Sequence, residues 1–415
     1  MQGTGPSGSI ETRASWAVAM AAVAILSFAF GAPLIVVIAL KPVAADLGAE
    51  RAVPALASSL AFLGAGAGGI LMGWLSGRIG MRAVAMIGAV MVGAGLVLAS
   101  GGTDWQLLLG YGVFVGLLGN GALFPPMLAY VSRWFDRRRG TALALVSSGQ
   151  YVAGVLWPVL FERAVALWGW QATMRGFAVV VLAGVLPIAA LVLRPAPVPP
   201  ASTGTRSGEA APGAPVLGLP PNLAMAIMGC GIFLCCVPMA MPAAHLVAFC
   251  TDLGIAAQQG ALMVSVLLVA AFLARQAWGW VADRIGGLQS VLAGNIAQVV
   301  GMSLFLVTQD EAGLFVVAAI YGMGFSGIIP SWMLAVRQLF PAGEASWRMP
   351  CVLFPGLAGM AFGAWLAGWM YDRFGNYAVA WEVGIALNVV QVALVATLLW
   401  RHLRHRPRMA GAVAA

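Results

Sequence analysis

Long runs of apolar residues dominate the pattern of hydrophobic and polar positions along the chain. Each run holds about 20 residues with few charges, the length that an α-helix needs to cross a bilayer. The runs are too long and continuous for the strands of a membrane β-barrel, which alternate over about ten residues. The pattern therefore predicts twelve membrane-spanning helices. They are expected at about residues 16–40, 53–75, 83–101, 105–131, 141–167, 172–193, 222–250, 259–281, 288–308, 312–339, 349–371 and 378–400.

Residues 194–221 interrupt the apolar pattern and divide the twelve runs into six and six. Proline, glycine, serine and threonine make up much of this segment, RPAPVPPASTGTRSGEAAPGAPVLGLPP, which favours an irregular linker. We therefore expect an all-α membrane protein with two pseudo-symmetric six-helix bundles. The predicted divisions are a tail over 1–15, bundles over 16–193 and 222–400, a linker over 194–221 and a basic tail over 401–415.

A short motif recurs at the ends of three runs. Residues 73–80 (GWLSGRIG) follow the second run, and residues 279–286 (GWVADRIG) follow the eighth run, 206 residues later. A third copy, residues 368–375 (GWMYDRFG), ends the eleventh run. These positions indicate a three-helix unit that is repeated in alternating orientation. Such symmetry is typical of transporters whose two halves rock around a central site.

The loop motif predicts a conformational latch between helix ends. Its glycines permit tight turns and close helix approach, while its acid can face the positive end of the next helix or pair with arginine. Gly77 replaces the acid in the first copy, so the latch is expected to be weaker in the N-terminal half. The residues assigned to the latch are Gly73, Arg78, Gly80, Arg82, Gly279, Asp283, Arg284 and Gly286.

These loops and the six-plus-six layout resemble the major facilitator superfamily over nearly all of residues 14–400. Residues 133–140 (RWFDRRRG), leading into residues 147–150 (SSGQ), are similar to the junction of spans 4 and 5 in many such transporters. An arginine within span 8, followed by GWVADR, resembles the monocarboxylate transporters and the related oxalate:formate antiporter group. The resemblance implies the twelve-helix major facilitator fold.

The chain departs from those groups at three places. Many animal monocarboxylate transporters have Asp four residues before the span 8 arginine, where this chain has Ala271. They also have Lys just after the span 1 proline, where this chain has Leu34, and the oxalate exchanger has a Lys in span 11 that is absent here. One embedded cation suits a monoanion better than a dianion on charge balance alone.

Composition and charge agree with a membrane protein. The chain is 61% hydrophobic and 9% charged, whereas soluble domains carry about 25% charged residues. The net charge of +8 does not gather in one patch, which argues against nucleic-acid binding. Most basic residues fall on one side if both termini are cytoplasmic, and this bias predicts a bacterial-type inner-membrane protein in that orientation. The sequence has no phosphate-binding loop, metal-ligand cluster or catalytic triad, so we expect no enzyme, metal or other cofactor.

Arg275 is the charged residue that lies deep inside an apolar run. It is about eight residues from the polar end at Asp283, or roughly 12 Å along a helix. A cation there costs from about 2.5 to above 10 kcal/mol. No partner is evident nearby, so the predicted partner is the cargo, whose carboxylate the planar guanidinium could hold through two hydrogen bonds. The alternative is a structural arginine that snorkels or binds helix-end carbonyls.

Several further residues are candidates for the site, each with plain packing as the alternative. A histidine in span 7, His245, could carry a proton, because histidine titrates near neutral pH. Polar candidates could contact a carboxylate or hydroxyl, and two phenylalanines could pack on a short alkyl group. These predicted substrate-binding residues are Asn120, Gln150, Tyr151, Tyr321, Phe30 and Phe354.

Together the features favour a secondary transporter for a small monocarboxylate of the lactate or pyruvate type, acting by alternating access. A proton could travel with the substrate or through His245. The alternatives are an oxalate/formate-type anion exchanger and an exporter of hydrophobic compounds. The expected partners are a small carboxylate, a proton and the lipid bilayer, and the expected state is a monomer.

Overall fold

The computed structural model describes residues 10–48, 52–196 and 215–405, and this part of the chain is almost entirely helical. Most of the predicted linker and tails lies outside the described residues. Helix α1 begins within the predicted first tail, and α16 continues to His405. The helices are α1 (Arg13–Ile38), α2 (Leu40–Leu47), α3 (Ala52–Ile79), α4 (Met81–Ala99), α5 (Asp104–Leu109), a π-helix (Gly110–Asn120), α6 (Gly121–Leu123), α7 (Pro125–Val131), α8 (Arg139–Ser147), α9 (Gly149–Val192), α10 (Pro221–Asp252), α11 (Ala257–Ile285), α12 (Gly287–Val307), α13 (Glu311–Phe325), α14 (Ile328–Leu339), a 3₁₀ turn (Ala342–Glu344), α15 (Ala345–Phe374) and α16 (Ala378–His405).

Eleven helical segments of the described chain are long and apolar enough to cross a membrane. The longest, Arg139–Val192, contains two spans, because the helix breaks at Gly169 with φ 78° and ψ 167°. Glycine adopts this conformation without the steric cost that a side chain would add. The two limbs pack against each other, with the rings of Trp157 and Phe177 edge to face at 4.8 Å. Counting both limbs gives twelve spans, and the predicted fold class is confirmed.

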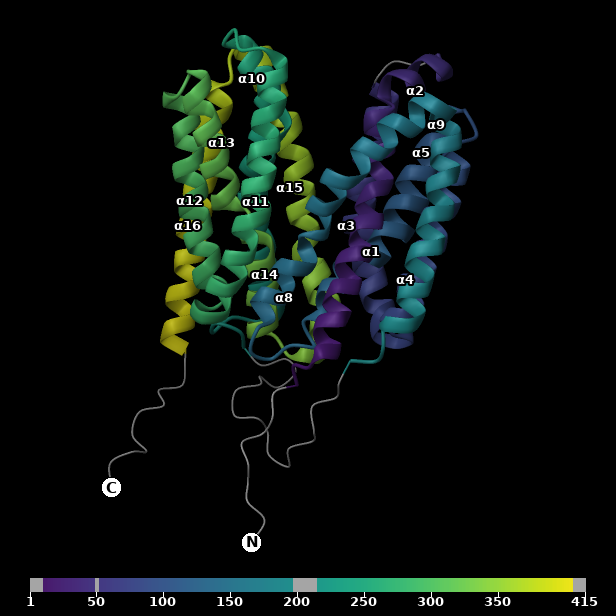
Figure 1. Ribbon diagram of the computed structural model, residues 1–415. Helices are drawn as coiled ribbons and strands as arrows, with labels where there is room; N and C mark the ends of the chain where they lie inside the picture. Colours follow the sequence, from purple (N-terminus) through teal and green to yellow (C-terminus); the bar gives the residue numbers. More distant parts are fainter. Residues whose placement is uncertain (1–9, 49–51, 197–214, 406–415) are drawn as a thin grey trace, which may run out of the picture.

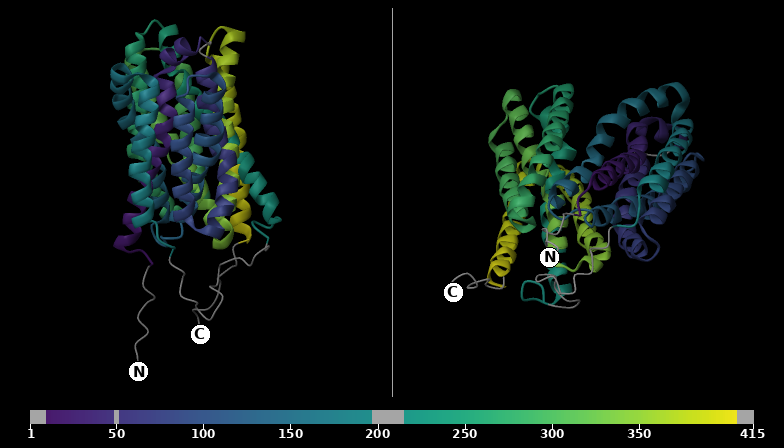
Figure 2. Two further views of the ribbon diagram at one scale, coloured as in Figure 1. Left: turned by 90° about the vertical axis from the view of Figure 1, so that its right-hand side faces the viewer. Right: turned by 60° about the horizontal axis from the view of Figure 1, so that its bottom comes forward.

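The spans form two bundles side by side, α1–α9 in one and α10–α16 in the other (Figure 1). We call them the N-bundle and the C-bundle. We call the end where α1 begins and α16 finishes the terminal end, which is at the bottom of Figure 1. The bundles approach each other toward the terminal end and diverge toward the opposite end, as the right-hand view of Figure 2 also shows.

The two halves keep the sequence offset of 206 residues in their local geometry. Gly80 and Gly286, which are 286 − 80 = 206 residues apart, have φ values of 85° and 91°. Each glycine is the N-cap residue of the next helix, α4 in one half and α12 in the other. The structure therefore places the first two copies of the loop motif in equivalent positions.

Glycines set the closest helix crossings. A Cβ atom at Gly363 of α15 would overlap the carbonyl oxygen of Val237 in α10, and one at Gly68 of α3 would overlap that of Leu117 in the π-helix. Small residues let membrane helices approach closely, and close packing contributes to their association. These positions therefore require glycine for packing.

We expect Gly363→Val to destabilise the protein by about 3 kcal/mol or more, because the added atoms force α10 and α15 apart. Thermal unfolding in detergent measures the effect. Gly154→Ala is the matched control, since a Cβ atom at Gly154 meets no heavy atom within 4 Å and alanine favours helix. Equal melting temperatures for the two variants would contradict this account of the crossing.

Candidate functional site

Arg275 of α11 lies at the contact between the two bundles and is 2% exposed. Its guanidinium donates three hydrogen bonds: Nε to the Ser326 carbonyl at 2.8 Å, Nη1 to the Ser147 carbonyl at 2.9 Å, and Nη2 to the Tyr151 hydroxyl at 2.8 Å. Its Cζ atom lies 4.3 Å from the centre of the Tyr151 ring. Ser147 and Tyr151 belong to the N-bundle, so one side chain connects both bundles.

Two helix ends supply the carbonyl groups that Arg275 binds. Ser147 is the last residue of α8, and Ser326 directly follows the last residue of α13. Carbonyls at a helix C-terminus lack a partner within the helix and carry partial negative charge. Arg275 therefore lies where two helix dipoles favour a cation. Binding to helix-end carbonyls is the alternative expected from the sequence, a structural arginine.

No described carboxylate neutralises Arg275. A second buried arginine, Arg348, is 4% exposed and differs in this respect, since its Nε lies 2.6 Å from Oε2 of Glu344. The acceptors around Arg275 are instead neutral. Because arginine stays protonated in proteins, the site keeps one net positive charge. A small anion would supply the missing negative charge.

A second polar contact crosses between the bundles beside Arg275. Gln276 of α11 donates from Nε2 to the hydroxyl of Ser148 at 2.8 Å, at the short break between α8 and α9. The sequence did not predict a role for Ser147, Ser326 or Gln276. The SSGQ stretch at residues 147–150 includes Ser147 and is part of the resemblance to other transporters. The break that frees the Ser147 carbonyl is visible only in the folded chain.

The other predicted substrate-binding residues lie at several places. Gln150 is half-buried next to Tyr151. Phe354 of α15 packs against Gly66 of α3, at the contact between bundles. Phe30 packs edge to face on Phe124 within the N-bundle, with ring centres 4.9 Å apart. Of the predicted residues, the structure thus brings Tyr151 directly to Arg275. Substrate contacts of Gln150, Phe354 and Phe30 stay predictions.

Asn120 ends the π-helical segment of the fourth span and is 5% exposed. Its Oδ1 atom has no hydrogen-bond partner among the described residues. A buried amide oxygen without a partner costs about 1–3 kcal/mol, and π-helices often occur at functional sites. Because of these features, Asn120 remains a candidate for binding the substrate.

Tyr321 and His245 have partners inside the C-bundle rather than at Arg275. The Tyr321 hydroxyl donates to the Pro238 carbonyl at 2.9 Å. His245 has Nε2 at 2.8 Å from the Ala364 carbonyl and Nδ1 at 3.0 Å from the Tyr377 hydroxyl. A carbonyl only accepts, so Nε2 carries the proton and Nδ1 accepts from Tyr377. Burial raises the pKa of the Tyr377 phenol, which keeps it a donor.

Asp283 lies at the terminal end of the interface between the bundles and bonds the start of α8. Its carboxylate accepts hydrogen bonds from the backbone N–H groups of Gly140 and Thr141 and from the Thr141 hydroxyl, the last at 2.6 Å. These donors form the first turn of α8, so an acid of the C-bundle caps a helix of the N-bundle. The negative charge also matches the positive N-terminal end of the helix.

The equivalent contact in the other half lacks a carboxylate. Gly77 lies near Ser346 in the first turn of α15, as the offset of 206 residues requires (283 − 77 and 346 − 140). A Cβ atom at Gly77 would be 3.5 Å from the Ser346 hydroxyl, which leaves room for a side chain. The expected weakness of the N-terminal latch therefore has a structural basis, and its strength stays a prediction.

The remaining latch candidates shape the helix ends. Gly73 packs against Ser346 and Pro350, and Gly279 packs against Ala144 and Thr141. Further arginines lie nearby with local contacts. These are Arg78 over the Trp74 ring at 3.8 Å, Arg284 over the Trp280 ring at 3.3 Å, and Arg82, whose Nε donates to the Leu193 carbonyl at 2.9 Å.

A second acid, which the sequence did not predict, lies at the start of α8. Oε1 of Glu11, just before α1, accepts from the backbone N–H groups of Arg137 and Arg138, both at 2.6 Å. Together with Asp283, it gives the N-terminal end of α8 a carboxylate from each bundle. A contact of 127 residues in sequence separation leaves no local signal.

The comparison that decides the family covers nearly the whole chain. The sequence model described as Major Facilitator Superfamily matches residues 17–248 and again residues 223–413. The chain belongs to the major facilitator superfamily. As a member of that superfamily it is a multi-pass membrane transporter rather than an enzyme.

Relatives within the superfamily include transporters with different names. The chain is 27% identical to rat monocarboxylate transporter 13 over 336 residues, which cover 78% of this chain and 74% of the relative. It is 25% identical to the MFS transporter asaE of Aspergillus flavus over 314 residues, which cover 74% and 69%. The resemblance to monocarboxylate transporters is therefore confirmed at the level of similarity.

Solved structures share the fold at low sequence identity. The proton:xylose symporter XylE has a TM-score of 0.71 at 13% identity, with 92% of this chain and 95% of that chain covered. FucP in the outward conformation has a TM-score of 0.67 at 15% identity, with coverages of 92% and 99%. These similarities establish the major facilitator fold.

Proposed function

We propose that this protein is a proton-coupled transporter of a small monocarboxylate of the lactate or pyruvate type. The proposal rests on Arg275, a buried cation between the two bundles that no described carboxylate neutralises. A monocarboxylate matches its single charge and its planar pair of donors. The similarity to proteins named monocarboxylate transporters supports the same substrate class.

The hydrogen bonds of Arg275 suggest how binding leads to movement. The Ser147 carbonyl and the Tyr151 hydroxyl are neutral N-bundle acceptors, whereas the Ser326 carbonyl belongs to the C-bundle. A carboxylate forms stronger, charge-assisted hydrogen bonds than these neutral groups do. A substrate that takes over Nη1 and Nη2 would therefore remove both Arg275 contacts with the N-bundle, while the Ser326 contact within the C-bundle persists and Gln276 still bonds Ser148.

The proton is assigned either to the substrate or to His245. A proton added at Nδ1 of His245 would turn that nitrogen from an acceptor into a donor and reverse its bond with Tyr377. That bond connects α10 to the segment between α15 and α16. Protonation would therefore change a contact within the C-bundle, away from Arg275.

The orientation in the membrane is also part of the proposal. Arg78, Arg82, Arg133 and Arg284 lie at or near the helix ends of the terminal end. The positive-inside rule places this end in the cytoplasm, as expected for a bacterial-type inner membrane. The bundles would then diverge toward the outside, so this conformation would receive substrate from there.

Thermal unfolding of the purified protein with paired ligands tests the substrate class. We expect lactate, pyruvate or a related acid at 100 times its Kd to stabilise the folded protein by about 2.7 kcal/mol. The methyl ester of the same acid is the matched control and should have no effect, because it lacks the charge that Arg275 requires. Equal stabilisation by acid and ester would contradict the proposal.

Two other functions are outcomes of the same experiment. A dicarboxylate that stabilises the protein better than every monocarboxylate would indicate an anion exchanger of the oxalate/formate type. Stabilisation only by large apolar compounds would indicate an exporter, as the relative named fujikurins efflux protein illustrates. Either result replaces monocarboxylate transport as the function.

A further inference from the structure

A pocket of about 550 Å³ at the terminal end of the N-bundle is lined by four arginines and no acidic residue. Arg78 comes from the end of α3, Arg82 from the start of α4, Arg133 from the segment after α7 and Arg194 from the segment after α9. Ser346 of α15 also lines the pocket, so it extends to the C-bundle.

None of the four arginines has a carboxylate partner among the described residues. Arg78 stacks on Trp74, and Arg82 uses Nε for the Leu193 carbonyl. The side chains of Arg133 and Arg194 are exposed, and neither donates a hydrogen bond to a described residue. Four like charges around one pocket repel one another, and an anion between them would relieve that repulsion.

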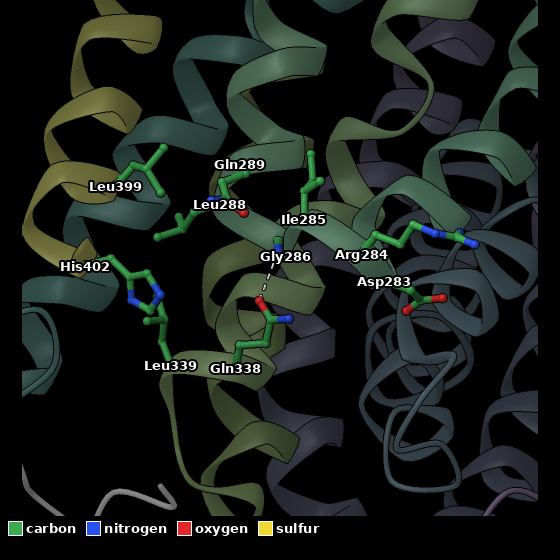
Figure 3. A pocket seen from close by; sticks show the side chains of 11 residues that line it. Asp283, Arg284, Ile285, Gly286, Leu288, Gln289, Gln338, Leu339, Leu399 and His402 are labelled. Carbon is green, nitrogen blue, oxygen red and sulfur yellow. Dashed lines mark hydrogen bonds between the residues drawn. The ribbon is translucent and has the colours of Figure 1, made fainter. Parts of the chain in front are cut away.

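The equivalent pocket in the C-bundle has a different charge. It is lined by Asp283, Arg284, Gln338 and His402 among others, and Figure 3 shows Arg284 directed away from Gln338 and His402. Gln338 accepts there from the backbone N–H of Gly287 at 2.9 Å. This pocket therefore contains the acid of the latch together with one arginine.

The offset of 206 residues pairs the two pockets position by position. Leu288 corresponds to Arg82 (288 − 82), Leu339 to Arg133 and Trp400 to Arg194, while Asp283 corresponds to Gly77. The half that lacks the carboxylate has thus gained three arginines at positions that are apolar in the other half. The missing carboxylate and the additional arginines thus lie in one pocket, next to the first turn of α15.

We propose that this pocket binds a phosphate group, and that the bound phosphate holds the N-terminal end of α15 as Asp283 holds that of α8. Arginine forms charge-assisted hydrogen bonds with phosphate, and a helix N-terminus also favours phosphate. The phosphate could come from an acidic phospholipid, because the pocket lies at helix ends, or from a soluble anion. In both cases it would replace the carboxylate that Gly77 cannot provide.

Native mass spectrometry of the full chain in maltoside micelles tests binding. The wild type, titrated with phosphatidylglycerol, should retain one lipid at least about tenfold more tightly than Arg82→Leu/Arg133→Leu, which copies Leu288 and Leu339. Arg284→Gln is the matched control from the other half and should bind as the wild type does. Equal binding by wild type and double variant, or equal loss in the control, would overturn the proposal.

Competition identifies the source of the phosphate. If millimolar inorganic phosphate displaces the lipid from the wild type, the pocket accepts soluble anions as well. If it does not, the ligand is the lipid headgroup. Both results support a phosphate site, provided that the double variant has lost it.

Hydrogen exchange of the first turn of α15 tests the effect on the latch. Phosphatidylglycerol should slow exchange of these amides about fivefold or more in the wild type. In Gly77→Asp, which restores the missing acid, exchange should already be slow without lipid and should not change when lipid is added. Unchanged exchange in the wild type, with the lipid bound, would show that the phosphate does not hold α15 and would overturn that half of the proposal.

Discussion

Replacing Arg275 by lysine should weaken binding of the monocarboxylate by at least about 30-fold and abolish its uptake into vesicles. Lysine retains a positive charge but lacks the planar fork that holds two carboxylate oxygens. Loss of one partner of a buried, hydrogen-bonded charge pair costs about 2–5 kcal/mol, and 1.4 kcal/mol corresponds to tenfold in affinity. Calorimetric titration measures binding, and labelled substrate measures uptake.

Tyr151→Phe is the matched control for Arg275→Lys. It removes the hydroxyl that accepts from Nη2 and retains the ring beneath the guanidinium. Because this hydroxyl competes with the substrate for the same donor, the variant should bind the acid as tightly as the wild type or a few times more tightly. Wild-type affinity in Arg275→Lys would show that Arg275 is not the carboxylate site.

The second large effect is expected for Asp283→Asn, which should shift the protein toward opening of its terminal end. The amide loses the charge that caps α8 and directs N–H groups at the N–H donors of Gly140 and Thr141. A cost of about 2–3 kcal/mol changes the ratio of conformations by about 30- to 150-fold. Distances between spin labels at Ile79 and Leu403, both exposed at this end, would record the shift after removal of the native cysteines.

Asp372→Asn is the control for this shift. Asp372 belongs to the third copy of the loop motif, near the end of α15 that is opposite to the latch, and it is exposed. The same chemical change there should leave the label distances as they are in the wild type. If Asp283→Asn also leaves them unchanged, the carboxylate does not hold the bundles together.

The fold could be predicted because bilayer crossing leaves a direct record in the sequence. Each span needs about 20 apolar residues, and the loop copies after spans 2 and 8 indicate the repeat from the sequence alone. The break between α8 and α9, which lies inside a predicted span, was not predicted. Gly169 lies between the predicted spans 141–167 and 172–193, whereas Ser148 lies inside the first of them, where the neighbouring Gly149 alone did not indicate a break.

The site was only partly predictable for the same reason. The position of Arg275 in an apolar run predicted a buried charge. Two of the three groups that accept its hydrogen bonds are backbone carbonyls, which become available only where α8 and α13 end. Backbone groups carry no residue signature, so no search of the sequence could select them. Asp283 was expected to face the positive end of the next helix or to pair with arginine. The first expectation was wrong, because Asp283 caps α8, whose Thr141 is 142 residues away in the chain and in the other bundle, and not the next helix, α12.

The uncompensated charge of Arg275 also has an electrical consequence. An arginine inside the membrane, with no neutralising carboxylate among the described residues, would make the empty protein sensitive to the transmembrane voltage whenever the bundles rearrange around it. A unit charge that crosses the whole field contributes about 2.3 kcal/mol per 100 mV, and a fractional displacement contributes in proportion. A bound monoanion would cancel this contribution. A proton carried together with the monoanion would restore it, so the voltage of an energised membrane would act on the loaded step about as strongly as on the return of the unloaded protein.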